Sequence, residues 1–135
     1  MNAHMYATRP SFSRSAAMFA LGALTYPVVE LLWRGHTHWT MSLTGGLCTM
    51  LIHLGNRRMA GRGLAARCGM GCAVITCTEF SVGCIVNRLL GWNVWDYSGA
   101  PLNILGQICP LYCVFWFLLS LPVLAISSRL LKITR

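Results

Sequence analysis

The sequence is short of charge, and it is especially short of acidic charge. Only 10% of its 135 residues are charged, with three Asp and Glu against eleven Lys and Arg, whereas a soluble domain carries about a quarter charged residues. The basic residues are separated by long uncharged stretches, so they form no basic face that could follow a phosphate backbone. With 56% apolar residues, the composition excludes an ordinary soluble domain and a nucleic-acid partner, and it indicates a lipid bilayer as the solvent.

Two motifs that would bring their own chemistry are missing. No Gly-x-x-x-x-Gly-Lys-Ser/Thr phosphate loop occurs, so the chain cannot itself be an ATPase. None of the seven cysteines forms a Cys-x-x-Cys pair; Cys68 and Cys72, like Cys109 and Cys113, are four residues apart, which stacks two thiols on one helical face. Two thiols alone make a poor metal site, and cysteine is a common packing residue. We therefore predict no cofactor and no metal.

Four segments, in contrast, are long and apolar enough to be membrane helices. They are residues 15–33, 39–55, 68–90 and 102–126. At 1.5 Å per residue each approaches the roughly 30 Å hydrocarbon core, although the second needs some local thinning of the bilayer. The first is long for a signal peptide and contains Pro27 and Glu30, so we interpret it as a helix. The sequence thus predicts an all-α, integral membrane bundle of four transmembrane helices, forming a single domain over 15–128.

The basic residues predict how this bundle is oriented. Four crossings place nine of the eleven Lys and Arg on one side, in the tail 1–14, in the loop between the second and third helices, and in the tail 129–135. Only Arg34 and Arg88 fall on the other side. Because cytoplasmic segments carry an excess of Lys and Arg, we expect both termini in the cytoplasm. At the opposite ends, where amphipathic rings prefer the headgroup region, lie Trp33, Trp39, Trp92 and Trp95.

Each predicted helix carries one stripe of small or polar side chains when it is plotted at about 100° per residue. The stripes contain Ala16, Ala23, Tyr26, Glu30 and Arg34 on the first helix, Ser42, Gly46, Thr49 and His53 on the second, Cys68, Cys72, Thr76, Glu79, Gly83 and Asn87 on the third, and Asn103, Gln107 and Pro110 on the outer half of the fourth. Small residues and hydroxyls are typical of helix packing in membranes. Packing explains the glycines and threonines, but it does not explain two carboxylates.

These two carboxylates are the main candidates for function, because an ionisable group near the bilayer centre costs about 2.5–3.5 kcal/mol on insertion scales. Glu30 is followed four residues later by Arg34, a favourable order for a salt bridge on one helical face. For Glu79 the one cation on its own helix is Arg88, nine residues on, which is roughly 13 Å along the axis. We therefore expect Glu79 to find a partner on another helix or to stay protonated, and we predict a functional role for it.

The stretch 94–110, VWDYSGAPLNILGQICP, is a polar island between the third and fourth helices. Asp96 suits an Asx-type turn, and Pro101 suits the first turn of the fourth helix. Pro27 and Pro110 each leave a carbonyl without its helical donor, and broken helices of this kind often border binding sites. The functional interpretation is a loop that closes an outward-facing cavity. The candidate substrate-binding residues are Glu30, Arg34, Glu79, Asn87, Asp96, Asn103 and Gln107.

Two stretches at these residues resemble a known family. PVVELLWRGHTHWTMSLTGG and EFSVGCIVNRLLGWNVWDYSGAPLNILGQICPLYCVFW are similar to small bacterial membrane proteins labelled "putative ABC transporter permease", sometimes "type IV", over about residues 20–120. The most specific motif runs from Trp95-Asp96-Tyr97-Ser98 to Gly106-Gln107-Ile108-Cys109. The resemblance implies a transporter subunit of the bacterial cytoplasmic membrane, forming a homo-oligomer or joining a separate ATPase or other membrane subunit through the 57–67 loop. That basic loop also predicts attraction to anionic membrane lipids.

Three functions remain open at this point. The first, which the resemblance favours, is a transport subunit that uses Glu79 and the Glu30–Arg34 pair to bind a charged or polar solute or a proton. The second is a membrane-embedded enzyme acting on a lipid or envelope precursor. Glu79 or Asp96 would be the candidate base of such an enzyme, but the sequence does not assign its catalytic residues. His36 and His38 would lie near its outer interface, but His-x-His without a third ligand is a weak metal signal. The third is a non-catalytic scaffold of a larger membrane complex.

Overall fold

The computed structural model describes residues 12–132, and these form a bundle of helices. The elements are α1 (Phe12–Arg34), α2 (Trp39–Arg58), α3 (Leu64–Gly83), the π-helix η2 (Cys84–Leu89) that continues α3, and α4 (Pro110–Lys132). Between η2 and α4 lies a loop, residues 90–109, in which an isolated β-bridge joins Ile104 to Ile108. No strand is present between residues 12 and 132, which confirms the predicted all-α class. Of the predicted tails, residues 12–14 belong to α1 and residues 129–132 belong to α4, and the remaining tail residues lie outside the described ones.

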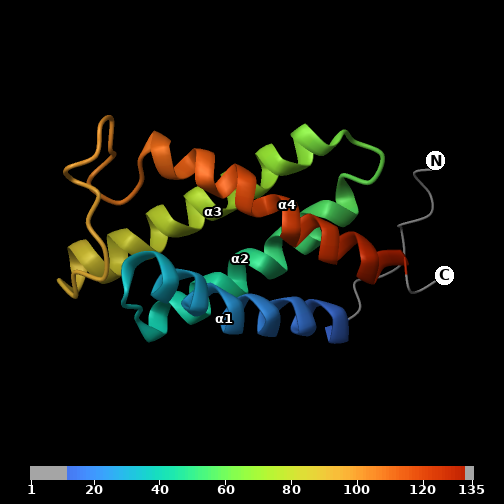
Figure 1. Ribbon diagram of the computed structural model, residues 1–135, viewed down its shortest axis with the longest axis horizontal. Helices are drawn as coiled ribbons and strands as arrows, with labels where there is room; N and C mark the ends of the chain where they lie inside the picture. Colours follow the sequence, from blue (N-terminus) through green and yellow to red (C-terminus); the bar gives the residue numbers. More distant parts are fainter. Residues whose placement is uncertain (1–11, 133–135) are drawn as a thin grey trace.

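The four long helices run back and forth along the longest axis of the molecule (Figure 1). The beginning of α1, the α2–α3 turn and the end of α4 lie at one end, whereas the α1–α2 connection and the 90–109 loop lie at the other. α2 packs against α1, α3 and α4, while α1 packs mainly against α2. The arginines of the α2–α3 turn therefore share one end of the bundle with Arg14 and Lys132, as the charge pattern predicts.

Only three of the helices within the described residues are long and apolar enough to cross a membrane by themselves: α1, the continuous α3–η2 segment and α4. The prediction of four such segments is therefore wrong for α2. The physical reason is that α2 is the central helix, with ten of its 20 residues buried, among them Thr44, Thr49, His53 and Asn56. A helix enclosed by its neighbours can carry polar groups that pair inside the bundle, so its own hydropathy is low.

α4 begins at Pro110, eight residues later than the predicted start at 102. Proline suits this first position because its fixed φ is helical and its missing N–H is not needed there. Leu102 and Leu105 have φ values of 57° and 54°, which lie in the left-handed region and are incompatible with a right-handed helix. The predicted helix start at Pro101 and the predicted break at Pro110 are therefore wrong, and the polar residues assigned to the outer half of this helix lie in the loop.

α1 and α2 approach each other closely because their contact surface is built from small residues. Gly22 faces Thr49 and the carbonyl of Gly45, and Gly45 in turn faces Tyr26 and the carbonyl of Gly22. A Cβ at either glycine would collide with these atoms. Gly46 lies against Phe19 in the same way. Most of the stripe predicted for the second helix thus lies on the surface on which α1 packs, although its last member, His53, faces α4.

The proline inside α1 has the consequence that the sequence predicts. Pro27 cannot donate to the Ala23 carbonyl, which would be its helical partner. The hydroxyl of Ser42 on α2 donates to that carbonyl at 2.5 Å. A side chain from the neighbouring helix thus replaces the missing backbone donor, which is the usual way in which a membrane helix tolerates proline.

α3 and α4 pack through thiols, hydroxyls and one glycine. Gly71 lies directly against Ser120. The thiol of Cys72 donates to the Cys113 carbonyl at 3.2 Å, and the hydroxyl of Thr76 lies 3.5 Å from the Cys113 sulfur. All seven cysteines are free, so these thiols act as small packing residues between the two helices.

A buried polar network joins α2, α3 and α4 near the end that carries the α2–α3 turn. His53 Nδ1 lies 2.8 Å from the Ser127 hydroxyl, and the Asn56 amide donates to the hydroxyls of Ser127 and Ser128 at 3.0 and 3.1 Å. The guanidinium of Arg67 donates to the Asn56 carbonyl oxygen at 3.1 Å. His53 and Asn56 are therefore satisfied by α3 and α4, whereas the hydroxyls of Thr44 and Thr49 donate to carbonyls of α2 itself.

Candidate functional site

Side chains from all four long helices and the 90–109 loop surround a cavity of about 350 Å³ near the end of the bundle opposite the α2–α3 turn. Most of its lining is apolar, and half of the lining residues are aromatic. The aromatic residues are Tyr26, Trp33, Trp95, Tyr97, Tyr112, Phe115 and Trp116. The charged lining residues are Glu30, Arg34 and Glu79, which are three of the seven candidates predicted from the sequence.

Glu79 lies on α3 with only 2% of its surface exposed. Its Oε2 accepts a hydrogen bond of 2.9 Å from the indole N–H of Trp116 on α4. Along the described part of the chain, ion pairs within 4.0 Å involve Glu30 and Arg34 and not Glu79. The expected partner on another helix is therefore an uncharged donor. Glu79 faces polar and aromatic neighbours inside the bundle.

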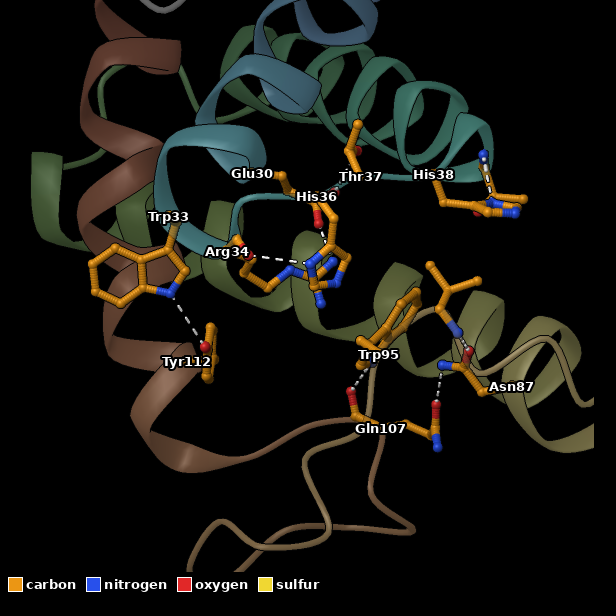
Figure 2. A network of polar contacts seen from close by, with 12 residues as sticks. Glu30, Trp33, Arg34, His36, Thr37, His38, Asn87, Trp95, Gln107 and Tyr112 are labelled. Atoms are coloured by element: carbon orange, nitrogen blue, oxygen red, sulfur yellow. Dashed lines mark hydrogen bonds and ion pairs between the residues drawn. The ribbon is translucent and has the colours of Figure 1, made fainter.

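Glu30 and Arg34 form the salt bridge that their spacing predicts, one turn apart at the end of α1 (Figure 2). The hydroxyl of Thr37 donates to the other oxygen of Glu30 at 3.3 Å. Gly35, with φ of +76°, ends the helix and allows the chain to turn so that Thr37 returns to Glu30. The carboxylate of Glu30 is thus neutralised within its own segment.

The aromatic lining residues other than Trp95 form one connected wall. The rings of Tyr97 and Tyr112 are stacked with centroids 4.4 Å apart, and Phe115 lies edge-on to both Tyr112 and Trp33 at 5.5 and 5.7 Å. The indole N–H of Trp33 also points at the Tyr112 hydroxyl, 3.4 Å away (Figure 2). Trp33 therefore helps to link the end of α1 to the beginning of α4, and Tyr26 and Trp116 link the same two helices with ring centroids 6.3 Å apart.

Asn87 and Gln107 anchor the loop to η2 instead of lining the cavity. The Asn87 amide donates to Gln107 Oε1 at 2.8 Å, and Asn87 Oδ1 accepts from the backbone N–H of Val94 at 2.6 Å. The indole N–H of Trp95, a residue only 4% exposed, donates to the Gln107 carbonyl at 3.1 Å (Figure 2). Trp95 is thus a buried anchor of the loop, whereas the sequence predicts that its ring lies at the headgroup interface.

Asp96 and Asn103 shape the loop itself. Asp96 Oδ1 accepts from the Ser98 backbone N–H at 2.9 Å, which is the predicted Asx-type turn. Hydrogen bonds from the hydroxyl and the backbone N–H of Ser98 hold the pKa of Asp96 below its ordinary value. The Asn103 amide donates to the carbonyls of Ser98 and Ala100, and its oxygen accepts from Gly106. Neither residue lines the cavity, and both hold the loop that carries Trp95 and Tyr97 to it.

The two histidines of the α1–α2 connection have local roles. His36 Nδ1 lies 3.1 Å from the Arg34 carbonyl. His38 is the N-cap of α2, where its Nδ1 accepts from the backbone N–H of Thr40 at 3.3 Å. No group of three or more His, Cys, Asp or Glu that could hold a metal ion occurs within residues 12–132.

Sequence analysis missed the aromatic wall, although part of its signal is present in the sequence. Tyr112, Phe115 and Trp116 are spaced by three and four residues, so they lie on one face of a helix. Tyr26 and Trp33, seven residues apart, share a face of α1. That these two faces meet around Glu79 depends on the tertiary arrangement and on the loop.

Comparison with known protein families identifies the family of this chain. A family model described as "Putative ABC-transporter type IV" matches residues 41–134. Neither a curated protein nor a solved structure matches the chain. The matched range begins within α2, so it contains Glu79 and most of the aromatic wall, while Glu30 and Arg34 precede it.

Proposed function

The chain belongs to the family described as "Putative ABC-transporter type IV", and on this premise we propose that it is a membrane subunit of a transporter in the bacterial cytoplasmic membrane. Its three long apolar helices fit a multi-pass membrane protein. In this proposal the cavity lined by Glu30, Arg34 and Glu79 faces outward and binds the transported solute. The observation that carries the proposal is Glu79: a carboxyl group enclosed among aromatic side chains, with no cation within 4.0 Å of it among residues 12–132.

The cost of such a group supports a role in binding. Ionisable residues inside membrane helices are expensive, and they usually face a bundle interior or a cavity that forms part of a substrate or ion pathway. Glu30 is paired with the cation Arg34, whereas Glu79 is held by uncharged donors, the Trp116 indole N–H and the Tyr26 hydroxyl. If this position of α3 served only for packing, a leucine would be less costly there than a glutamate. The presence of the glutamate therefore favours a ligand or a proton as a further partner of its carboxyl group.

We place α2 across the membrane as the fourth span. It has 20 residues, about 30 Å at 1.5 Å per residue, and it extends along the same axis as the other three helices. Because α1, α3 and α4 cover it, its polar residues need not contact lipid. Four crossings put the beginning of α1 and the end of α4 on one side, and the excess of basic residues at that end favours the cytoplasm.

The subunit does not act alone in this proposal. The chain has no phosphate loop, so an ABC-type transporter needs a separate ATPase. Four helices are few for a transport pathway, so we also propose that the chain forms a homo-oligomer or assembles with another membrane subunit. The basic α2–α3 turn lies at the end where a cytoplasmic ATPase would dock, and it also suits anionic lipid headgroups.

The complex purified from its native membrane in mild detergent provides the test. It is reconstituted into liposomes, supplied with ATP and a metabolite extract of the source cell, and the solutes that move across the membrane are identified by mass spectrometry. We expect at least one solute to move faster than in empty liposomes, and Glu79→Gln to abolish that movement. Asp96→Asn, a carboxyl-to-amide change outside the cavity, should leave it intact.

Two results would contradict the proposal. If the wild-type complex moves no solute above the rate of empty liposomes, the transport function is wrong. If Glu79→Gln moves the same solutes at the wild-type rate, the transport function stands but Glu79 has no part in it.

A further inference from the structure

We propose that the cavity binds a lipophilic organic monocation, a molecule with a bulky apolar body and one quaternary or protonated nitrogen, with Glu79 as its counter-charge. This assignment rests on the proposed function, because it names the class of solute that the same cavity would take. Three features of the cavity carry it: its aromatic wall, its balance of charge and its position between α1 and α4, which meet there through aromatic side chains.

The aromatic wall is suited to a cation with apolar substituents. A cation over the face of a Trp or Tyr ring within about 6 Å is attracted by the ring quadrupole, by about 0.5–2 kcal/mol depending on desolvation. Half of the cavity lining is aromatic, and Tyr112 alone contacts the rings of Tyr97, Phe115 and Trp116 at 4.4 to 5.7 Å. The rings therefore offer stacking surface to the body of the ligand and several faces to its charge.

The balance of charge favours one positive charge on the ligand. Arg34 neutralises Glu30 within α1, while Glu79 has no cation within ion-pair distance along residues 12–132. Two carboxyl groups against one guanidinium leave room for a single cation. An anion would meet an uncompensated carboxyl group in a water-poor site, where like charges repel strongly.

The same lining disfavours the smaller and more polar alternatives. An inorganic cation needs several oxygen ligands to replace its water shell, and the cavity supplies two carboxyl groups on different helices. A sugar or another highly hydroxylated solute would leave many of its hydrogen bonds unmade against aromatic walls, at a cost for each. A molecule with an apolar body and one charge needs neither a shell of oxygen ligands nor many hydrogen-bond partners.

The position of the cavity gives such a molecule a route in from the bilayer. The cavity lies between α1 and α4, which meet there through aromatic side chains. Trp33 bridges the two helices at the surface through Tyr112 and Phe115. Trp33 itself is 66% exposed, and Leu32 beside it is also exposed on the outer surface of α1. Lipophilic cations partition into membranes, so movement of the Trp33 side chain would admit them from the side.

Tetraphenylphosphonium and tetraphenylborate make a matched pair of probes, because they share shape and apolar surface and differ in the sign of their charge. Binding of each is measured by equilibrium dialysis against the full chain in nanodiscs, with empty nanodiscs as the blank. We expect saturable binding of tetraphenylphosphonium and none of tetraphenylborate. Glu79→Gln should weaken tetraphenylphosphonium by about thirtyfold or more, the scale of losing a desolvated charge partner, while Asp96→Asn should not change it.

A second pair of variants keeps the test independent of the buried carboxyl group. Trp33→Leu removes an exposed ring at the mouth of the cavity, and Trp39→Leu removes a similarly exposed ring (63%) outside it. Only Trp33→Leu should weaken tetraphenylphosphonium, by roughly twofold to thirtyfold for a cation–π contact.

Three outcomes would overturn the assignment. Equal binding of the two probes would mean that the cavity selects for apolar surface alone. Suppression of tetraphenylphosphonium binding by phosphatidylethanolamine in the nanodiscs would identify a lipid headgroup as the occupant. If tetraphenylphosphonium fails to bind while the native complex still transports another solute in a Glu79-dependent way, the ligand class is wrong and the transport function stands.

Discussion

The three acidic side chains are each held by a different kind of partner. Glu79 accepts from an indole N–H on another helix, Glu30 pairs with a guanidinium one turn away, and Asp96 accepts from a backbone N–H in the exposed loop. The carboxyl group therefore has three roles in this chain: it is buried in the cavity at Glu79, neutralised by a salt bridge at Glu30, and part of a turn at Asp96. The sequence predicts the second and third from local spacing. It cannot predict the partner of Glu79, because Trp116 is 37 residues away.

Asp96 should make the order of the 90–109 loop depend on pH. Its pKa is lower in the folded state than in the unfolded chain, because hydrogen bonds from Ser98 favour the carboxylate. A lowered folded-state pKa gives stability that is present above the unfolded value of about 3.9 and is lost as the pH falls through the folded value. Amide hydrogen exchange at Ser98 should therefore accelerate on acidification below about pH 4, after correction for intrinsic rates.

Asp96→Asn is the control for this prediction. The amide oxygen of asparagine can accept the same hydrogen bond from Ser98 but does not titrate in this range. The variant should keep the exchange protection of Ser98 and lose its pH dependence. Identical pH profiles for the wild type and the variant would show that Asp96 does not control the turn.

Ser42 and Pro27 should be energetically coupled. Ser42→Ala leaves the Ala23 carbonyl beside Pro27 without a donor, which should cost roughly 0.5–2 kcal/mol of unfolding free energy. In a Pro27→Ala background the backbone N–H of residue 27 can donate to that carbonyl, so the cost of Ser42→Ala should fall close to zero. A double-mutant cycle in mixed micelles measures the difference. Equal costs in the two backgrounds would mean that Ser42 does not replace the missing donor.

At the scale of the helices, the starts of α1, α2 and the continuous α3–η2 segment could be predicted, and the start of α4 could not. α1 and the continuous α3–η2 segment begin within a few residues of the predicted positions, because lipid-facing helices must be apolar throughout. The fourth helix was placed too early because Pro101 and Pro110 are equally suited to a first turn. The choice between them depends on contacts of the loop, such as the Trp95–Gln107 bond, that no local pattern reveals.

The glycines of the α1–α2 contact give a test at this scale. Gly45→Ala would drive a methyl group into Tyr26 and the Gly22 carbonyl, so it should destabilise the bundle by about 1–3 kcal/mol. Gly69→Ala is the matched control, because no atom lies within 4 Å of the added methyl group. In a helix interior this change should be neutral or stabilising by up to about 1 kcal/mol. Unfolding in mixed micelles compares them, and equal effects would contradict the close contact between α1 and α2.

At the scale of the whole molecule, the cavity and the basic residues lie at opposite ends of the bundle. The cavity, the aromatic wall and the 90–109 loop lie at one end, and the α2–α3 turn with its arginines lies at the other. Between them, α2 carries polar residues that pair with α1 and α4, such as Ser42 with Ala23 and His53 with Ser127. This division suits the proposed transporter subunit, in which solute would bind near one membrane face and a partner ATPase would act at the other.

The number of crossings can be decided because three and four spans predict opposite topologies. If α2 crosses the membrane with the other helices, the beginning of α1 and the end of α4 lie on the same side; if it does not, they lie on opposite sides. We expect green fluorescent protein fused at either terminus to fluoresce, since it does so in the cytoplasm. Alkaline phosphatase inserted after Trp92 should be active, since it requires the other side. One fluorescent and one dark terminal fusion would show three crossings, and it would exclude α2 as a span.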